Sequence, residues 1–359
     1  MDRFNCRSPY IIEVNGDAGQ VGTKIFLEVY SQDLSTLLVA KEIEKKMFSP
    51  TNRINYYNIS PYVYDVLNTL DLNYFGCIVY VHKFFTGNGT EYNQFEDLTF
   101  VSTNGYSDYT EANYLQTANF IPLNKQVSYP INYTRSGNYP KLDCIFDFND
   151  NDTVYYAELK KGSHIETTTI ANTGGYFFNR FDLTNSNSNF NETNTFKIYR
   201  IDLAERVYLY SVTLVALCEP KFSPIGLDFV NRYGGLQKMT FFKNSIQTIE
   251  VKGSEYNTNN FNNYPHYTQD LGQKRVYNKN GSKTIKCNSG WVNEAENENI
   301  KDIMLSENLL LTYTEEGATV TKAVTLKSSS QLLKTGLNEK VINYELEFEV
   351  ASQLINNVI

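Results

Sequence analysis

The stretch from Pro220 to Val251, PKFSPIGLDFVNRYGGLQKMTFFKNSIQTIEV, constrains the fold of this chain more than any other segment. Residues 227–230 alternate with the two-residue period of a β-strand. The pair Gly234–Gly235 then provides a turn, because glycine adopts positive φ without steric cost. Two further strand-like runs follow, at residues 236–242 and 246–251. Three consecutive strands with short turns predict an antiparallel meander.

The composition favours a β protein. Of the 359 residues, 28 are Tyr and 22 are Phe, and Asn-rich tracts recur between the strand-like runs. Tyr and Phe suit strands and Asn suits turns, with disorder as the alternative for the Asn tracts. The length predicts two or three domains, each large enough to bury a core. We therefore expect a mainly β chain with two or three antiparallel β-sandwich-like domains and short helices.

Charge and hydropathy exclude several classes of protein. The formal net charge of −8 argues against dedicated nucleic-acid binding, which needs a basic surface. The N-terminal residues contain no apolar signal segment. No run approaches the roughly 18 apolar residues that a membrane helix needs. We expect a chain that is made in a cytoplasm and has no membrane partner.

The cysteines indicate a reducing compartment. They are odd in number, widely spaced and never arranged as C-x-x-C, which fits neither a disulfide framework nor a zinc site. Free cysteines of this kind are usually buried. The five residues predicted to be free buried thiols are Cys6, Cys77, Cys144, Cys218 and Cys287.

Polar loops divide the chain into three expected domains. Residues 1–123 are expected to form a β-sandwich with one short helix, which begins at Ser60-Pro61 because Ser can cap and Pro fits the first turn. Residues 124–267 are expected to form a β domain that contains the meander. Residues 268–359 are expected to form an α+β domain.

Further elements are predicted within these regions. Strands at 142–148 and 153–160 are expected to form a hairpin. Asn293 and Glu296 resemble a capping box, which predicts a helix after them. From Val341 to Val350 apolar and polar residues alternate, so one face of that strand is expected to be core and the other wet or in contact with a partner.

One constellation suggests an enzyme. Asp143 lies on one expected strand, and Glu158 and Lys160 lie on the next. This is the arrangement of the PD-(D/E)xK nucleases, in which two carboxylates hold Mg²⁺ and the lysine positions or activates water. The motif is short and common by chance, and Pro140 is separated from Asp143 by two residues. The alternative is a hairpin with solvated charges.

Other candidate sites are weaker. Asp147, Asn149, Asn151 and Glu158 have the ligand spacing of an EF-hand, but Asp152 replaces the required glycine, which leaves at most a casual cation. Trp291 could be a sugar platform, although a lone Trp is more often core. The three histidines have no metal-ligand spacing; they are His82, His164 and His266. We therefore assign no catalytic, cofactor-binding or metal-binding residue.

Three segments resemble proteins of one viral lineage. They are Leu227–Gln237 with the following Phe241-Phe242, Ser289–Glu294, and Tyr344–Phe348. The pattern resembles tail and neck structural proteins of crAss-like podoviruses and related tailed phages that infect Bacteroidetes. The resemblance implies a structural subunit of a bacteriophage virion: a ring, tail hub or fibre-attachment protein. None of the matching residues is catalytic.

These observations lead to three hypotheses. The first is a non-enzymatic virion component that is made in the host cytoplasm and assembles as a homo-oligomer, in a symmetric ring, with other neck or tail proteins and with tail fibres. The second is a receptor- or glycan-binding tail protein, because Tyr and Asn suit carbohydrate contacts. The third is a Mg²⁺-dependent nuclease. Copy number, symmetry and neighbours are left open by the sequence.

Overall fold

The computed structural model divides the chain into two compact units. Unit 1 contains Met1–Glu219 and Asp228–Lys238, and unit 2 contains Pro220–Leu227 and Met239–Ile359. The expected region 124–267 is divided between the units. Residues 124–219 and 228–238 fall in unit 1 with the expected region 1–123, and residues 220–227 and 239–267 fall in unit 2 with the expected region 268–359. The described residues are 2–16, 19–46, 53–70, 72, 74–108, 110–111, 113, 120–124, 128–131, 141–148, 154–161, 163–170, 176–183, 194–202, 204–216, 222–258, 272–292, 294, 296–331, 333 and 342–355.

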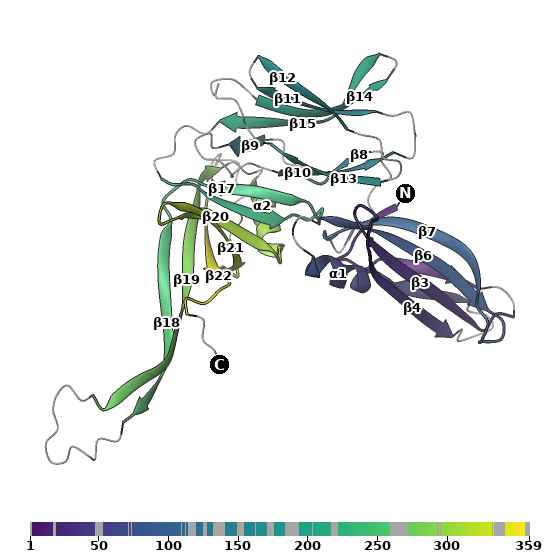
Figure 1. The fold of residues 1–359 in the computed structure, drawn as a ribbon, viewed down its shortest axis with the longest axis horizontal. Helices are drawn as coiled ribbons and strands as arrows, with labels where there is room; N and C mark the ends of the chain where they lie inside the picture. The colour runs from purple at the N-terminus through teal and green to yellow at the C-terminus, as the bar shows by residue number, and fades with distance from the viewer. Residues whose placement is uncertain are drawn as a thin grey trace. The chain divides into compact units, whose positions relative to one another are not determined.

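Strands dominate both units, which confirms the mainly β fold class. Two helices, α1 and α2, occur among the described residues. Figure 1 shows the strands arranged in several twisted sheets. Within the same residues, no helix has the length and apolar character needed to cross a bilayer.

The first part of unit 1 is a five-stranded sheet with a helix against it (Figure 1). The strand order is β1 (Asp2–Asn5), β7 (Asn93–Thr103), β6 (Gly76–Thr86), β3 (Gly22–Ser31) and β4 (Leu37–Lys46). The short strands β2 (Ile11–Asn15) and β5 (Ile54–Asn58) form a separate antiparallel pair. Alternate residues of β3, among them Ile25, Leu27 and Val29, are buried in one hydrophobic core, as the predicted strand period requires.

The predicted helix after residue 59 is present as α1 (Ser60–Thr69). Val63, Val66 and Leu67 recur at helical spacing and are buried. The expected capping role of Ser60 is wrong: its hydroxyl donates to the carbonyl oxygen of Ser8 at 2.7 Å, and no side chain caps the helix. Ser60 therefore fixes the helix to the N-terminal segment.

The second part of unit 1 is a pair of sheets around a shared core. One sheet has the order β13 (Tyr176–Asp182), β10 (Lys141–Asp147), β8 (Phe120–Pro122). The other has the order β12 (His164–Ile170), β11 (Tyr155–Lys161), β14 (Asn194–Asp202), β15 (Glu205–Ala216), β9 (Ser128–Ile131). Buried residues from both sheets, such as Phe146 and Ile198, form one cluster. The arrangement is a β-sandwich.

The expected hairpin over residues 142–160 is wrong. β10 pairs with β13 and β8, whereas β11 pairs with β12 and β14. The two strands lie in opposite sheets because each contributes alternate apolar residues to the same core, Phe146 from β10 and Tyr155 from β11. Burial of both apolar faces decides the topology against the short connection.

The tip of the predicted hairpin, residues 228–238, is built into unit 1. The side chain of Asn231 donates to the carbonyl oxygen of Leu123 at 2.9 Å and accepts from the backbone N–H groups of Tyr233 and Gly235. Gly234 has φ of +84°, which confirms the predicted turn. A Cβ on Gly234 would lie 2.7 Å from Cβ of Thr103. Only glycine satisfies both the backbone angle and the close approach.

Unit 2 is organised by a seven-stranded sheet. The order is β17 (Leu236–Phe241), β16 (Ile225–Val230), β20 (Leu309–Glu315), β21 (Ala318–Leu326), β22 (Ile342–Val350), β19 (Lys274–Val292) and β18 (Ile246–Asn257). Unit 2 contains residues 225–227 of β16 and 239–241 of β17. The helix α2 (Glu296–Leu305) follows β19 and buries Ile300 and Ile303, as predicted; Asn293 of the expected capping box lies outside the described residues.

The meander prediction is wrong in its third strand. β16 and β17 are neighbours, but β18 lies at the opposite end of the strand order and pairs with β19. The 19-residue β19 gives β18 an antiparallel partner along nearly its whole length. That long ladder offers more hydrogen bonds than the six residues of β17 could.

The prediction for the last strand is confirmed. Along β22, Tyr344, Leu346 and Phe348 are buried, whereas Asn343 and Glu345 are exposed. The period of two therefore separates a core face from a polar face of the same sheet.

The turn at Gly234 gives a testable prediction. Gly234→Ala adds backbone strain and a clash, and we expect it to destabilise unit 1 by about 2 kcal/mol or more. The matched control is Gly89→Ala, because Gly89 has φ of +79° and its nearest neighbour would be an ordinary 3.8 Å contact. Urea denaturation measures both variants. Equal losses would show that the close approach to Thr103 contributes nothing.

Candidate functional site: the exposed arm of β18 and β19

The structure separates the residues of the nuclease motif. Leu142 and Cys144 point into the core of the sandwich, so Asp143 between them points to the opposite side of its sheet. Tyr155 and Ala157 likewise face the core, so Glu158 points away from it in the other sheet. The two carboxylates therefore face away from each other across a sandwich about 10 Å thick. This arrangement does not let them share a metal ion.

Asp143 is instead the anchor of a buried ion pair. Its carboxylate accepts from Nε and Nη2 of Arg180 at 2.6 and 2.9 Å. The same carboxylate accepts from the backbone N–H of Leu236 at 2.7 Å, and Arg180 also donates to the carbonyl oxygen of Leu72 at 2.9 Å. The group is not presented to substrate, since Asp143 is fully buried. Its role is to hold segments of unit 1 together.

The other predicted positions are dispersed. Glu158 pairs with Arg206 at 2.9 Å, and His82 lies 2.6 Å from a carboxylate oxygen of Asp97. His164 is exposed beside Glu166. Among the described residues, no group of three or more His, Cys, Asp or Glu side chains could hold a metal ion. Asn149, Asn151, Asp152 and His266 lie outside the described residues.

The expectation for the cysteines is confirmed where it can be checked. The free and buried thiols are Cys6, Cys77, Cys144 and Cys287. Burial raises the pKa of Cys287 to about 12, and it also raises the pKa of Cys77 and Cys144. These thiols are inert, because the thiolate is the reactive form. Cys218 lies outside the described residues.

The core interpretation of Trp291 is wrong. Its side chain is 70% exposed near the end of β19. Gly290, with φ of +70°, and a register shift between Asn288 and Trp291 interrupt the pairing with β22 just before it. Such an irregularity turns a side chain out of the regular alternation.

Unit 2 carries an exposed arm (Figure 1). It is formed by β18 with the following residue 258, and by residues 272–283, which include the first part of β19. Residues 284–292 of β19 lie in the part of the strand that pairs with β22, and residues 284–286 also pair with β18. Among the described strands, residues 274–283 pair only with β18. Every residue of β18 is exposed. The arm is therefore a two-stranded ribbon that continues past the sheet.

The arm carries apolar side chains that water surrounds. Ile249 and Val251 are each 61% exposed, and Tyr256, Val276 and Tyr277 are also exposed. A two-stranded ribbon is marginally stable by itself. Contiguous exposed apolar residues on such an element usually mark an interaction surface.

The alternation along the arm divides these residues between two faces. The register places Gln247 opposite Ile285 and Ile249 opposite Lys283, so Ile249 and Val251 lie on the face that contains the buried Ile285. The core face of the sheet thus runs out along the arm, where Ile249 and Val251 remain exposed. The register slips between residues 252 and 254 of β18, where Asn278 of β19 has φ of +52°. This irregularity is a β-bulge in β19, so β18 itself stays regular.

Two lysines and one carboxylate fix the base of the arm. Glu315 on β20 accepts from Lys283 of β19 and Lys322 of β21, each at 2.6 Å. These hydrogen bonds, with that of Lys283 the larger, lower the pKa of Glu315 to about 2. The cluster joins the arm to the hairpin of β20 and β21.

The chain after β22 crosses the base of the arm. The backbone N–H of Leu354 donates to the carbonyl oxygen of Gly281 at 2.8 Å, and the side chain of Asn280 bonds both Gln353 and the backbone of Ile355. A Cβ on Gly281 would lie 3.0 Å from Cδ1 of Leu354. This crossing segment, residues 351–355, is called the tail below.

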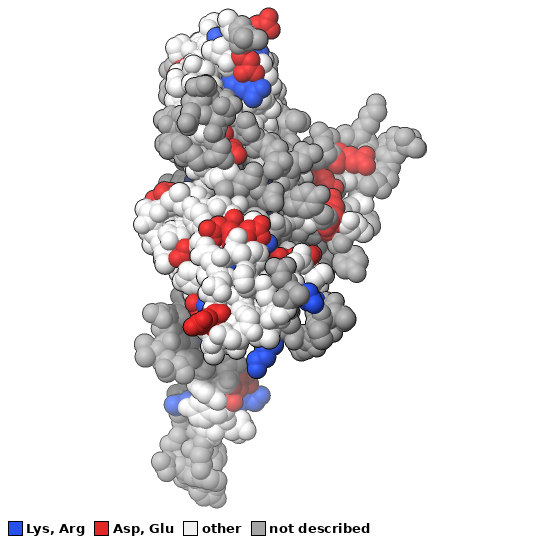
Figure 2. Space-filling model, turned by 90° about the vertical axis from the view of Figure 1, so that its right-hand side faces the viewer, with Lys and Arg blue, Asp and Glu red and all other residues white. Residues whose placement is uncertain are grey.

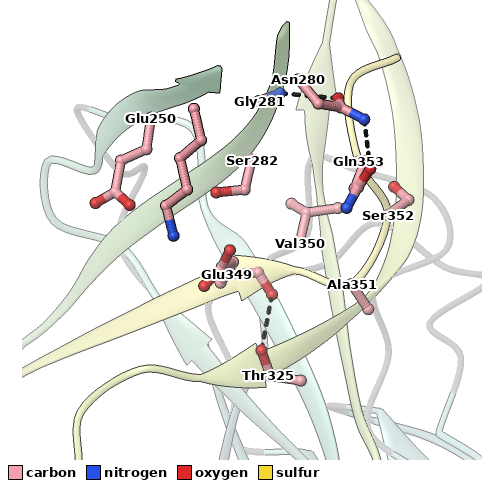
Figure 3. Close-up of a pocket in the computed structure, with 11 residues that line it drawn as sticks. Glu250, Asn280, Gly281, Ser282, Thr325, Glu349, Val350, Ala351, Ser352 and Gln353 are labelled. Atoms are coloured by element: carbon pink, nitrogen blue, oxygen red, sulfur yellow. Dashed lines mark hydrogen bonds between the residues drawn. The ribbon is translucent and has the colours of Figure 1, made fainter. Parts of the chain in front are cut away.

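Between the tail and the strands lies an open polar hollow of about 470 Å³ (Figure 3). Glu250, Ser282 and Glu349 line it from the strands, and Ser352 and Gln353 line it from the tail. A hydrogen bond from Lys327 lowers the pKa of Glu250. A general acid near neutral pH needs the opposite shift, so Glu250 acts here as a fixed negative charge.

The surface charge agrees with the acidic composition. On the face drawn in Figure 2, acidic side chains gather in several patches and basic side chains are sparser.

The sequence analysis predicted only one part of the arm, the strand-like run at residues 246–251. The missed signal was the β-propensity of Thr, Val and Tyr between Ile246 and Asn257, and between Lys274 and Ser282. No buried face marks these residues, so a period-two search for a core does not find them.

The ion pair of Asp143 gives the second prediction. Asp143→Asn leaves the largely buried guanidinium of Arg180 without its counter-charge, and we expect a loss of about 3–5 kcal/mol in the free energy of unfolding. Asp182→Asn, at the exposed end of the neighbouring strand, is the control. Its free energy of unfolding should stay within about 0.5 kcal/mol of that of the natural protein. Urea denaturation distinguishes them. A loss below 1 kcal/mol would contradict the anchoring role.

The Glu315 cluster gives a pH prediction. The folded-state pKa of about 2 lies below the ordinary value of 4.5, so its stabilisation is complete above pH 4.5 and disappears as the pH falls toward 2. Glu315→Gln should lower the melting temperature at pH 7. The difference in melting temperature between this variant and the natural protein should shrink as the pH falls from 4.5 toward 2. Glu316→Gln, at the exposed neighbouring position, should show no such convergence. A difference that stays constant with pH would contradict the assignment.

Comparison with known proteins gives no assignment. No family model matches the chain, and a search of curated proteins finds no significant match.

Proposed function

We propose that this chain is a non-enzymatic structural subunit of a tailed-phage virion, in the neck or tail, that assembles with copies of itself and with neighbouring virion proteins. Its role is that of a ring, hub or fibre-attachment subunit. The assignment to a particle rests on the resemblance of residues 227–237, 289–294 and 344–348 to crAss-like phage proteins. The assignment to an assembly role rests on the arm.

The observation that carries the proposal is the exposure of the arm. A monomeric protein gains nothing by extending Ile249 and Val251 into water on a ribbon that packs on no core. The same ribbon becomes stable when a neighbour covers its apolar face or adds a strand to its edge. Protection by neighbours is the usual state of such elements in assemblies.

The residues that do carry unusual chemistry support a structural role. The buried carboxylate of Asp143 accepts three hydrogen bonds, two from Arg180 and one from a backbone N–H group. Four thiols are buried. Each of these groups is used to hold the fold, and none is presented to solvent for reaction.

The proposal is tested by making the arm polar. Ile249→Ser with Val251→Ser removes exposed apolar area only, so the purified variant should keep its melting temperature within about 2 °C. Incorporation into phage particles, measured by quantitative mass spectrometry of purified virions, should fall at least about tenfold. Ile165→Ser, at a 52%-exposed position in unit 1, is the matched control and should incorporate normally.

Two outcomes would redirect the assignment. Normal incorporation of the double variant would remove the arm as an assembly surface. Normal particles that fail to adsorb to host cells after Trp291→Ala would favour the receptor- or glycan-binding alternative, for which the 70%-exposed Trp291 is the relevant feature.

A further inference from the structure

The free edge of β18 is the strongest unassigned feature of the described chain. β18 is the last strand in the order of its sheet, and among the described strands only β19 is paired with it. All twelve of its residues, Ile246–Asn257, are exposed. An edge of this length presents a row of backbone donors and acceptors that another strand can bind.

We propose that this edge pairs with β18 of a second copy of the chain, antiparallel, about a two-fold axis at Val251. The inference rests on the proposed function, because it names the partner of the same arm. In this arrangement Val251 lies opposite Val251 of the second copy, and Glu250 lies opposite Lys252. A strand related to itself by a two-fold axis makes each such contact twice.

The charges select this register. A two-fold axis perpendicular to the sheet leaves each side chain on the same face in both copies. Residues that lie opposite each other must share a face, so the axis must pass through a residue position. The alternative registers therefore have the axis at a neighbouring residue. Moving the axis to position 250 places Glu250 opposite Glu250, and moving it to 252 places Lys252 opposite Lys252. Parallel pairing of equivalent residues also places like charges together, which is destabilising. Only the axis at 251 sets opposite charges against each other.

The register also brings apolar side chains together. Ile246 lies opposite Tyr256, and Ile249 lies opposite Gly253, against which Val276 and Lys279 of β19 pack. Aromatic–aliphatic cross-strand pairs contribute to sheet stability. The two copies of Ile249 and Val251 then form one continuous apolar stripe on the shared face. The product is a four-stranded sheet, which is no longer a marginal ribbon.

The charges are available for this contact. Lys252 forms no salt bridge with any described residue. Glu250 lies 2.7 Å from Lys327 of its own chain, and an exposed carboxylate has lone pairs for a second cation. The pairing therefore adds charge contacts and breaks none.

Disulfide formation tests the register. In a Cys218→Ser background, Val251→Cys places two thiols on opposite residues whose Cα atoms are about 4.5–5.5 Å apart, within reach of a disulfide. Ile249→Cys is the matched control, because Ile249 is also 61% exposed. Its two copies would lie about 14 Å apart. Mild oxidation should give mostly cross-linked dimer for Val251→Cys and only the background level for Ile249→Cys. Equal cross-linking of the two, or none at Val251→Cys, overturns the proposal.

A charge exchange tests the paired ions. Lys252→Glu puts Glu opposite Glu at two places, so the dimer dissociation constant measured by sedimentation should rise on the order of tenfold. Adding Glu250→Lys restores opposite charges between copies and should recover most of the loss. A double variant that dimerises no better than Lys252→Glu contradicts the register.

The two proposals fail separately. Arm-dependent incorporation into particles without Val251→Cys dimers would refute the two-fold pairing and leave the assembly role. A specific Val251→Cys dimer from a protein that particles do not need would refute the assembly role and leave the pairing.

Discussion

Unit 1 depends on one buried ion pair. The carboxylate of Asp143 binds the guanidinium of Arg180 through two hydrogen bonds and also holds the backbone N–H of Leu236. A fully buried charge is tolerated only when it is paired and its lone pairs are used. Asp143, Arg180 and Leu236 come from β10, β13 and the tip at residues 228–238. Pairing this one carboxylate therefore holds together segments that are distant in sequence.

Both units have an exposed edge strand, and the two edges differ in what supports them. In unit 1, β12 ends its sheet with six of seven residues exposed, but it pairs along its whole length with β11, which contributes to the sandwich core. In unit 2, β18 has every residue exposed and continues past the sheet as part of the arm. An edge of the second kind is stabilised from outside the chain. The proposed assembly role follows from that difference.

The sequence predicted local structure well and long-range pairing poorly. The period-two pattern of β22 and the turn at Gly234 could be read from the sequence, because each depends on neighbours along the chain. The expected hairpin over 142–160 and the third strand of the meander failed, because the partners β13 and β19 are chosen by burial and by ladder length. The spacing of Asp143 and Glu158 suggested a metal site, but the two carboxylates lie on opposite sides of the sandwich and cannot share a metal ion. The arm carries no core pattern and was seen only in fragments.

The tail is hydrogen-bonded to the base of the arm. Asn280 and Gly281 of β19 are tied to residues 353–355 by hydrogen bonds, and the absence of a side chain on Gly281 allows Leu354 to lie against the strand. The arm base therefore protects the amide hydrogens of Leu354 and Ile355 from exchange. Local opening of either segment frees the other, so the two behave as a single cooperative element.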